Sequence, residues 1–151
     1  MIQIASKVTG KTLSVDADTL ERADLAGANL HRFELQGANL RHANLRGADA
    51  RNVELQNADL SGANLRGASL ANAFLDGARL SDAHLDGAIL SGASFIGACL
   101  DHASLRGAHI RVADFSDADL TNVRLSGATY DAATLWPVGF DPAAYGATIE
   151  E

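Results

Sequence analysis

The side chains most suited to nucleophilic chemistry are the single cysteine and the polar groups that follow it. Cys99, Asp101 and His102 lie close together in the sequence, and a thiol beside an acid and an imidazole is a set that covalent catalysis can use. Such a site also needs a positioned base and a pocket that excludes water. The repeat described below places these residues on a convex outer wall, so we predict no catalytic residue here.

The histidines show no spacing typical of metal ligands. They are His31, His42, His84, His102 and His109. His42 and His102 share a column of the predicted fold, but they lie three coils apart, about 14 Å at the usual strand spacing, which is too far to share one ion. The chain also lacks a phosphate-binding loop and a dinucleotide fingerprint. We therefore predict no metal, no cofactor and no enzymatic activity.

The overall charge narrows the classes of partner. The 151 residues carry a net charge of −7 at pH 7, which argues against direct binding to nucleic acid or to an anionic membrane and permits a basic protein partner. Cys99 has no second cysteine to pair with, which favours a reducing compartment. The first residues do not resemble a signal peptide, and no apolar run is long enough for a membrane helix. We expect a cytoplasmic protein.

A five-residue repeat positions all of these side chains. Every fifth residue from Leu20 to Tyr130 is apolar, and two residues before each lies a second series, mostly alanine, from Ala23 to Ala128. Residues 38–42, Ala-Asn-Leu-Arg-His, therefore alternate in, out and in, as a strand does, and then make a polar corner. A helix would spread the leucines around its axis instead of aligning them. A unit this short cannot be a domain, so the chain is predicted to be a solenoid.

The glycines indicate how many sides one coil has. One column at a spacing of 20 residues is all glycine: Gly27, Gly47, Gly67, Gly87, Gly107 and Gly127. The column offset by ten residues is also rich in glycine and the other two are poor, which fits a four-sided coil better than a three-sided one. Glycine at the end of a unit suits the third position of a type II turn, where φ is positive. We predict an all-β solenoid, a quadrilateral β-helix of about five and a half 20-residue coils.

The two ends of the chain differ from the repeats, and a solenoid needs caps there because its core and strand edges are open. We predict a single domain over 1–151, with an N-terminal cap at 1–19, the β-helix at 20–130 and a C-terminal cap or tail at 131–151. Apolar alternation in 1–19, around residues 8–11, predicts a short hairpin or a strand lid. In the tail, Trp136, Phe140 and Tyr145 either plug the core or form a dimer seam, and we prefer the plug.

The repeat resembles that of a known family. Units such as Ala-Asn-Leu at 38–40, Ala-Asp-Leu-Ser-Gly at 58–62 and Ala-Asp-Leu at 118–120 are similar to the unit of the pentapeptide-repeat proteins, over residues of about 18–130. The resemblance implies a right-handed quadrilateral β-helix and a protein that is not an enzyme. One branch of the family, the quinolone-resistance proteins, binds DNA gyrase as an acidic dimer that resembles DNA. This chain is shorter than those proteins, has no loop that interrupts the repeats and is only modestly acidic.

The predicted coil sorts the outward residues onto four sides. The side centred on Leu35, Leu55, Leu75, Phe95 and Phe115, called the acidic side below, carries Glu34, Glu54, Asp76, Asp114 and Asp117 and no Lys or Arg. It also carries two outward apolar residues, Phe74 and Ile96, and Ile89 points outward on the adjacent side. The opposite side carries Arg46, Arg66, Arg106 and Arg124. These charges and apolar residues are either an interaction surface or an ordinary solvated one.

The sequence therefore predicts a non-enzymatic scaffold that presents flat charged sides to another protein of unknown identity. The alternative is a DNA mimic that binds a topoisomerase such as DNA gyrase. That alternative needs a homodimer, formed through the C-terminal tail, to gain length. A monomer suffices for the scaffold.

Overall fold

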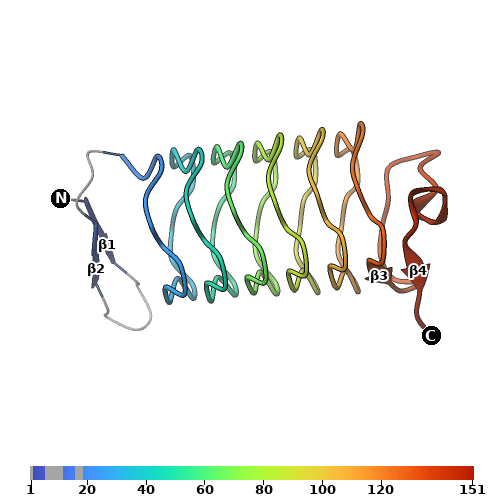
Figure 1. Cartoon of the computed structure of the whole chain (residues 1–151), viewed down its shortest axis with the longest axis horizontal. Coiled ribbons are helices and arrows are strands. Elements are labelled where there is room, and N and C mark those ends of the chain that lie inside the picture. Colours follow the sequence, from blue (N-terminus) through green and yellow to red (C-terminus); the bar gives the residue numbers. More distant parts are fainter. Residues whose placement is uncertain (1, 6–11, 16–18) are drawn as a thin grey trace.

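The computed structural model describes residues 2–5, 12–15 and 19–151, and Figure 1 shows a rod of stacked turns with the two termini at opposite ends. The named elements lie near these ends. They are β1 (Ile2–Ala5), β2 (Thr12–Val15), β3 (Thr129–Tyr130), the 3-10 helix η1 (Pro142–Tyr145) and β4 (Thr148–Ile149). Between β2 and β3 the chain forms isolated bridges rather than long strands, because each side of a turn contributes only a few extended residues.

Parallel bridges between residues 20 positions apart hold the turns together. Four ladders begin in the first turn, at Asp24, Asn29, Glu34 and Asn39, and each outward residue pairs with its counterpart in the next turn, as in Asp24↔Asn44. This is the 20-residue spacing that the glycines predict. The backbone hydrogen bonds between turns are short and regular. The amides and carbonyls of a complete turn therefore find their partners in the neighbouring turns.

The corners have the geometry that the end of each repeat unit predicts. The Ala43 amide donates to the Leu40 carbonyl at 3.0 Å, and His42 between them has a φ of 54°. A positive φ at the third residue of a turn is the mark of type II. Glycine and asparagine adopt it at low cost, as at Gly67 (φ 65°), whereas Val112 adopts the same conformation (φ 60°) with a β-branched side chain.

The two apolar series fill the interior of the rod. Leu40, Leu60 and their counterparts are fully buried, and the alanines between them leave room for the turns to stack closely. Phenylalanine replaces leucine at two successive positions of one column, and the rings of Phe95 and Phe115 stack with 4.8 Å between centroids. The buried residues form one continuous core cluster.

The repeat continues past Tyr130 after one extra residue. The last bridge of the ladder that begins at Glu34, Asp114↔Leu135, spans 21 positions instead of 20. Thr134 therefore takes the inward position that alanine holds elsewhere, and its hydroxyl donates to the Ile110 carbonyl at 2.9 Å. Trp136 takes the next inward position, where it stacks on Phe115. The insertion shifts the phase of the repeat, so Ala133 and Leu135 are exposed although they keep the five-residue rhythm of the sequence.

The remaining C-terminal residues lie against the last repeats. β4 pairs in parallel with β3, Thr148 opposite Thr129, and η1 packs beside β4 (Figure 1). Trp136 and Phe140 are partly buried against the core cluster.

At the other end, β1 and β2 pair in antiparallel register from Ile2↔Val15 to Ala5↔Thr12. The predicted turn around residues 8–11 lies outside the described residues, and the capping role of 1–19 stays a prediction.

Candidate interaction surface

One ladder brings together most of the residues predicted for the acidic side. Its members, in order, are Glu34, Glu54, Phe74, Ser94, Asp114 and Leu135. Acidic residues thus lie toward both ends of the ladder and Phe74 lies between them. Sequence reasoning missed Leu135, which is 53% exposed, because the one-residue insertion that turns it outward leaves no mark in the five-residue rhythm.

The other predicted residues of this side lie at its corner. Asp76 accepts a hydrogen bond from the Ser94 hydroxyl at 2.6 Å, and Ile96 is in the next turn, where its carbonyl accepts from the Gly77 amide. Asp117 occupies a corner position with a φ of 58°. The Gln36 side chain donates to the Glu54 carboxylate.

Among the described residues, Glu54, Asp76, Asp114 and Asp117 make no ion pair. The ion pairs of the repeats lie elsewhere, as between Arg51 and Asp49 at 2.7 Å. On the opposite, basic side, Arg66 lies 3.4 Å from Asp86.

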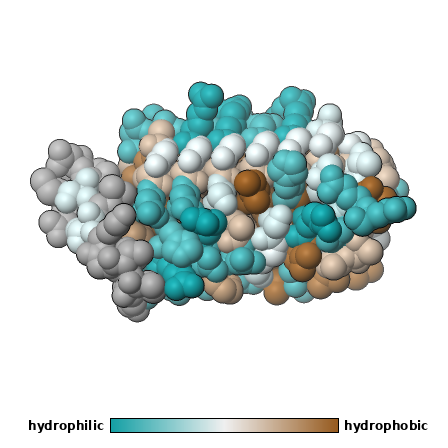
Figure 2. Space-filling view, turned by 90° about the horizontal axis from the view of Figure 1, so that it is seen from below, coloured by the Kyte–Doolittle hydropathy of each residue, from teal (hydrophilic) through white to brown (hydrophobic). Residues whose placement is uncertain are grey.

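The outward apolar residues are exposed as predicted. Phe74 is 44% exposed, and Ile96 and Ile89 are each 42% exposed. Ile89 belongs to the ladder Ser69↔Ile89↔His109 on the adjacent side, and Val112, 57% exposed, lies at the corner that follows this side in the next turn. Figure 2 shows one side of the rod, on which hydrophobic residues lie among hydrophilic ones in the middle and gather toward the C-terminal end.

The residues around Cys99 are close together but are not arranged for nucleophilic catalysis. The Cys99 thiol lies 3.0 Å from an Asp101 carboxylate oxygen, and His102 lies 3.4 Å from the other oxygen of that carboxylate. Hydrogen bonds from Ser81 and Cys99 and the neighbouring His102 lower the pKa of Asp101. The imidazole therefore faces the carboxylate and not the thiol, so His102 is not placed to act as the base of a Cys–His pair. Within the described part of the chain, no group of acids, histidines and cysteine is placed to hold a metal ion.

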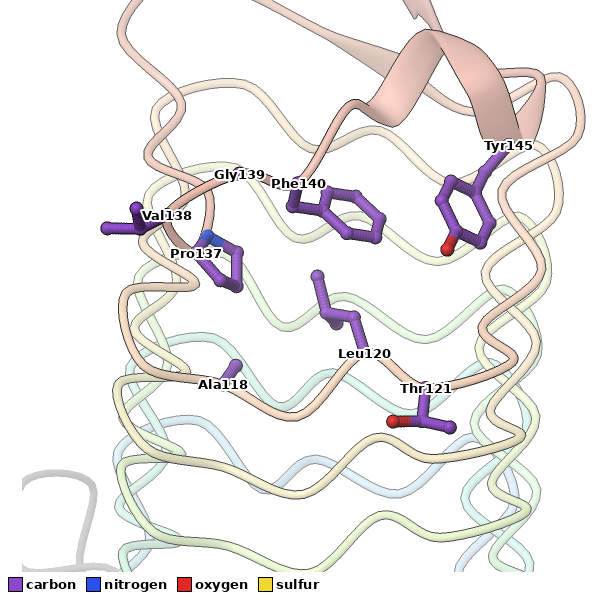
Figure 3. Close-up of a pocket in the computed structure, with 8 residues that line it drawn as sticks. All are labelled: Ala118, Leu120, Thr121, Pro137, Val138, Gly139, Phe140 and Tyr145. Carbon is purple, nitrogen blue, oxygen red and sulfur yellow. The ribbon is translucent and has the colours of Figure 1, made fainter.

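The aromatic residues of the C-terminal tail form a connected stack. Trp136 stacks on Phe115 and on Phe140, Tyr130 meets its indole edge-on, and Tyr145 stacks on Phe140 at 4.8 Å. Figure 3 shows a cavity between this tail and the last repeats, with Phe140 and Tyr145 on one side and Ala118, Leu120 and Thr121 on the other. Tyr145 remains 42% exposed.

The family follows from the repeat. The model described as pentapeptide repeats matches residues 20–57, 58–97 and 88–127, with eight copies of the repeat. This chain belongs to the pentapeptide-repeat family. Proteins of this family are right-handed β-helix solenoids and are generally structural or interaction proteins rather than enzymes.

Solved structures of the family resemble the chain. The pentapeptide-repeat protein alr5209 from Nostoc PCC 7120 is 34% identical, with 74% of this chain and 84% of that chain covered and a TM-score of 0.47. HetL, from the same cyanobacterium and involved in the regulation of heterocyst differentiation, is 23% identical, with 84% and 78% covered and a TM-score of 0.47. Trypsin-treated QnrB1, a plasmid-mediated fluoroquinolone resistance protein, is 20% identical, with 84% and 79% covered and a TM-score of 0.39.

A search among curated proteins finds no match. In residues 2–5, 12–15 and 19–151, no helix is long and apolar enough to span a membrane.

Proposed function

We propose that this pentapeptide-repeat protein is a non-enzymatic scaffold that binds another protein through its acidic side. The observation that carries the proposal is a single ladder along the rod. In it, Phe74 lies between Glu34 and Glu54 toward the N-terminal end and Asp114 toward the C-terminal end. Protein interfaces commonly have an apolar centre and a polar rim. A ladder with this order offers both on one flat surface.

The charge of the acidic side supports a basic partner. The carboxylates of Glu54, Asp76, Asp114 and Asp117 make no ion pair among the described residues. Their negative potential attracts and orients a positively charged surface. Phe74 and Ile96 supply apolar area at the centre, and Ile89 extends it around the corner. The partner that fits is a protein with a basic, partly apolar patch.

The rod itself would hold this surface rigid. In the proposal, the right-handed β-helix has about five and a half coils, with residues 1–19 and 131–151 as caps, and Trp136, Phe140 and Tyr145 plug the C-terminal end. The same three residues would form the seam if the protein is a homodimer. Because the one free cysteine, Cys99, has no internal partner, we place the protein in a reducing compartment such as the cytoplasm.

A second candidate function is that of a DNA mimic which binds a topoisomerase such as DNA gyrase. The regular spacing of Glu34 and Glu54 in successive turns favours it, although the charges are much sparser than the phosphates of DNA, about one for every 1.7 Å. Inhibition of gyrase supercoiling by the wild-type protein, together with a dimeric mass in solution, would support the mimic. A monomer that leaves supercoiling unchanged would exclude it.

Capture of partners from a lysate of the source organism tests the scaffold. One bait is the wild-type protein, and a second carries Phe74→Ser and Ile96→Ser, which remove the apolar centre but keep every charge. A partner that is retained by the wild type and at least tenfold depleted on the second bait supports the proposal. Equal recovery on both baits would show that binding occurs elsewhere.

A further inference from the structure

The C-terminal end of the rod lacks one strand on one of its sides. Among the described residues, the Ala118 carbonyl and the amides of Leu120 and Asn122 have no hydrogen-bond partner. Ala118 and Leu120 also line the cavity shown in Figure 3. Unpaired strand edges of this kind bind extended chains readily.

In every complete turn, the equivalent backbone groups on this side of the rod are hydrogen-bonded to the next turn. In an earlier turn, the Ala38 carbonyl accepts from the Asp59 amide at 3.0 Å and the Leu40 amide donates to the Asp59 carbonyl at 2.8 Å. The His42 amide donates to the Ser61 carbonyl at 2.9 Å. An added strand thus needs one residue that uses both its amide and its carbonyl, and a second residue, two positions later, that uses its carbonyl.

The chain's own tail does not supply this strand. Pro137 has no amide hydrogen, and the Phe140 amide donates to the Pro137 carbonyl at 3.0 Å, which closes a turn. The chain then enters η1, capped by the Asp141 side chain, and rejoins the stack only where β4 pairs with β3. The path therefore leaves the backbone of the edge at residues 118–122 uncovered, although the side chains of Ala118 and Leu120 are buried.

The space above this edge has room for a side chain. The cavity has a volume of about 280 Å³, and Figure 3 shows Leu120 pointing toward Phe140 across it, while Val138 points away. An inward residue of an added strand would lie above Leu120, in contact with the Phe140 ring. The apolar walls favour an aliphatic side chain there.

The negative charge at this edge favours a basic residue at the outward position of the added strand. Asp119 is the outward residue of the uncovered edge, and its carboxylate accepts from the Thr121 amide at 3.0 Å. Asp117, at the preceding corner, adds a second negative charge. Opposite charges directly across two strands stabilise the pair, and like charges destabilise it.

We propose that this edge binds an extended peptide segment of a partner protein by parallel strand addition, with a Lys or Arg above Asp119 and an aliphatic residue above Leu120. The segment has a small residue, a basic residue and an aliphatic residue in succession. The basic residue donates its amide to the Ala118 carbonyl and accepts from the Leu120 amide. This site lies at the end of the rod and shares only the corner residue Asp117 with the acidic side.

A labelled peptide tests the proposal directly. The probe is the peptide Gly-Ser-Ala-Lys-Leu-Ser-Gly-amide with a fluorophore on its N-terminal nitrogen, titrated with the full chain and followed by anisotropy. We expect a dissociation constant at or below about 1 mM. Methylation of the lysine amide nitrogen removes the donor to Ala118 and should weaken binding about tenfold. Replacement of lysine by aspartate in the peptide should weaken it as well.

Protein variants locate the binding. Asp119→Asn keeps the oxygen that caps Thr121 but removes the charge, and should weaken binding of the lysine peptide about twofold to fivefold. Thr121→Trp should fill the cavity and abolish binding. Arg41→Trp, at the same corner position of an earlier turn, is the matched control and should bind as the wild type does.

Three results would overturn the proposal. The first is no binding of the unmodified peptide at about 1 mM. The second is equal binding of the unmodified and the N-methylated peptide to the wild-type protein, a comparison that needs no protein variant. The third is self-association of the wild type that Thr121→Trp abolishes, which would assign this edge to a second copy of the chain. None of these results bears on binding at the acidic side.

Discussion

The indole ring of Trp136 stacks on the ring of Phe115 with 5.0 Å between their centroids and 6° between their planes. Phe115 stacks in the same way on Phe95, so a residue of the C-terminal tail continues a column of the core. The contact depends on the extra residue between Tyr130 and Trp136, which moves Trp136 into the inward position that follows Phe115.

This stack predicts a stability cost when the indole is removed. Trp136→Ala should lower the free energy of unfolding by about 3 kcal/mol, at the low end for such truncations because the ring is only partly buried. Urea denaturation followed by circular dichroism measures it. Trp136→Phe keeps a ring on Phe115 and should cost less than about 1.5 kcal/mol. A cost below about 1 kcal/mol for the alanine variant would show that the tail does not stabilise the core.

Asp131 holds the inserted segment in place and predicts a pH dependence. Hydrogen bonds from the Val112 amide, from Arg111 and from the Ala133 amide lower the pKa of its carboxyl. A group whose pKa is lowered by folding stabilises the fold above its unfolded pKa, about 3.9, and loses this effect as the pH falls through the folded pKa.

Asp131→Asn should therefore lower the urea midpoint at pH 7, and the difference from wild type should shrink as the pH falls below about 4. Urea titrations of both proteins at several pH values between neutral and acidic check this. A difference that stays constant over the whole range would mean that the carboxylate charge contributes nothing.

Val112 is a strained residue whose replacement should stabilise the protein. Its φ of 60° is in the left-handed region, which costs an L-residue with a Cβ roughly 1–2 kcal/mol. Its side chain is 57% exposed and so loses little burial on replacement. Asparagine tolerates this region, so Val112→Asn should raise the free energy of unfolding by about 1 kcal/mol. Val138→Asn, at an exposed valine without positive φ, should change nothing measurable.

Phe74 and Ile96 point outward and Phe95 points inward, so substitutions at these positions should differ in their effect on stability. Phe74→Ser with Ile96→Ser should cost less than about 1 kcal/mol, because both side chains are largely exposed. Phe95→Ser removes a fully buried ring from the same side and should cost more than about 3 kcal/mol. Thermal melts of the two variants compare them. Unfolding of the double variant would mean that the inward and outward positions are exchanged there.

The repeats could be predicted from the sequence because their structure is local. Leu40, Ala38 and His42 each carry the signal for their own position, and the columns of glycine give the length of a turn. The outward exposure of Phe74 and Ile96 follows from the same pattern. None of these positions depends on a contact that the five-residue unit does not itself encode.

The C-terminal end could not be predicted in the same way. In the phase shift Thr134 replaces an inward alanine, and the Ile110 carbonyl accepts a hydrogen bond from its buried hydroxyl. The outward position of Leu135 follows from that tertiary contact. The open edge at residues 118–122 likewise depends on where the tail leaves the stack.

Capture with charge-matched baits tests whether the acidic side is the surface that binds the partner. One bait is the wild type, and one carries Glu34→Gln, Glu54→Gln, Asp76→Asn, Asp114→Asn and Asp117→Asn. The third carries the same number of neutralised acids on other sides and at the C-terminus: Asp24→Asn, Asp82→Asn, Asp86→Asn, Glu150→Gln and Glu151→Gln. Recovery of each partner is quantified by mass spectrometry.

We predict a partner that the wild type and the third bait retain equally and that the acidic-side bait loses. Equal loss on both variant baits would show that the interaction depends on the net charge of the protein and not on the acidic side. Equal retention on all three baits would contradict the assignment of the acidic side as the binding surface.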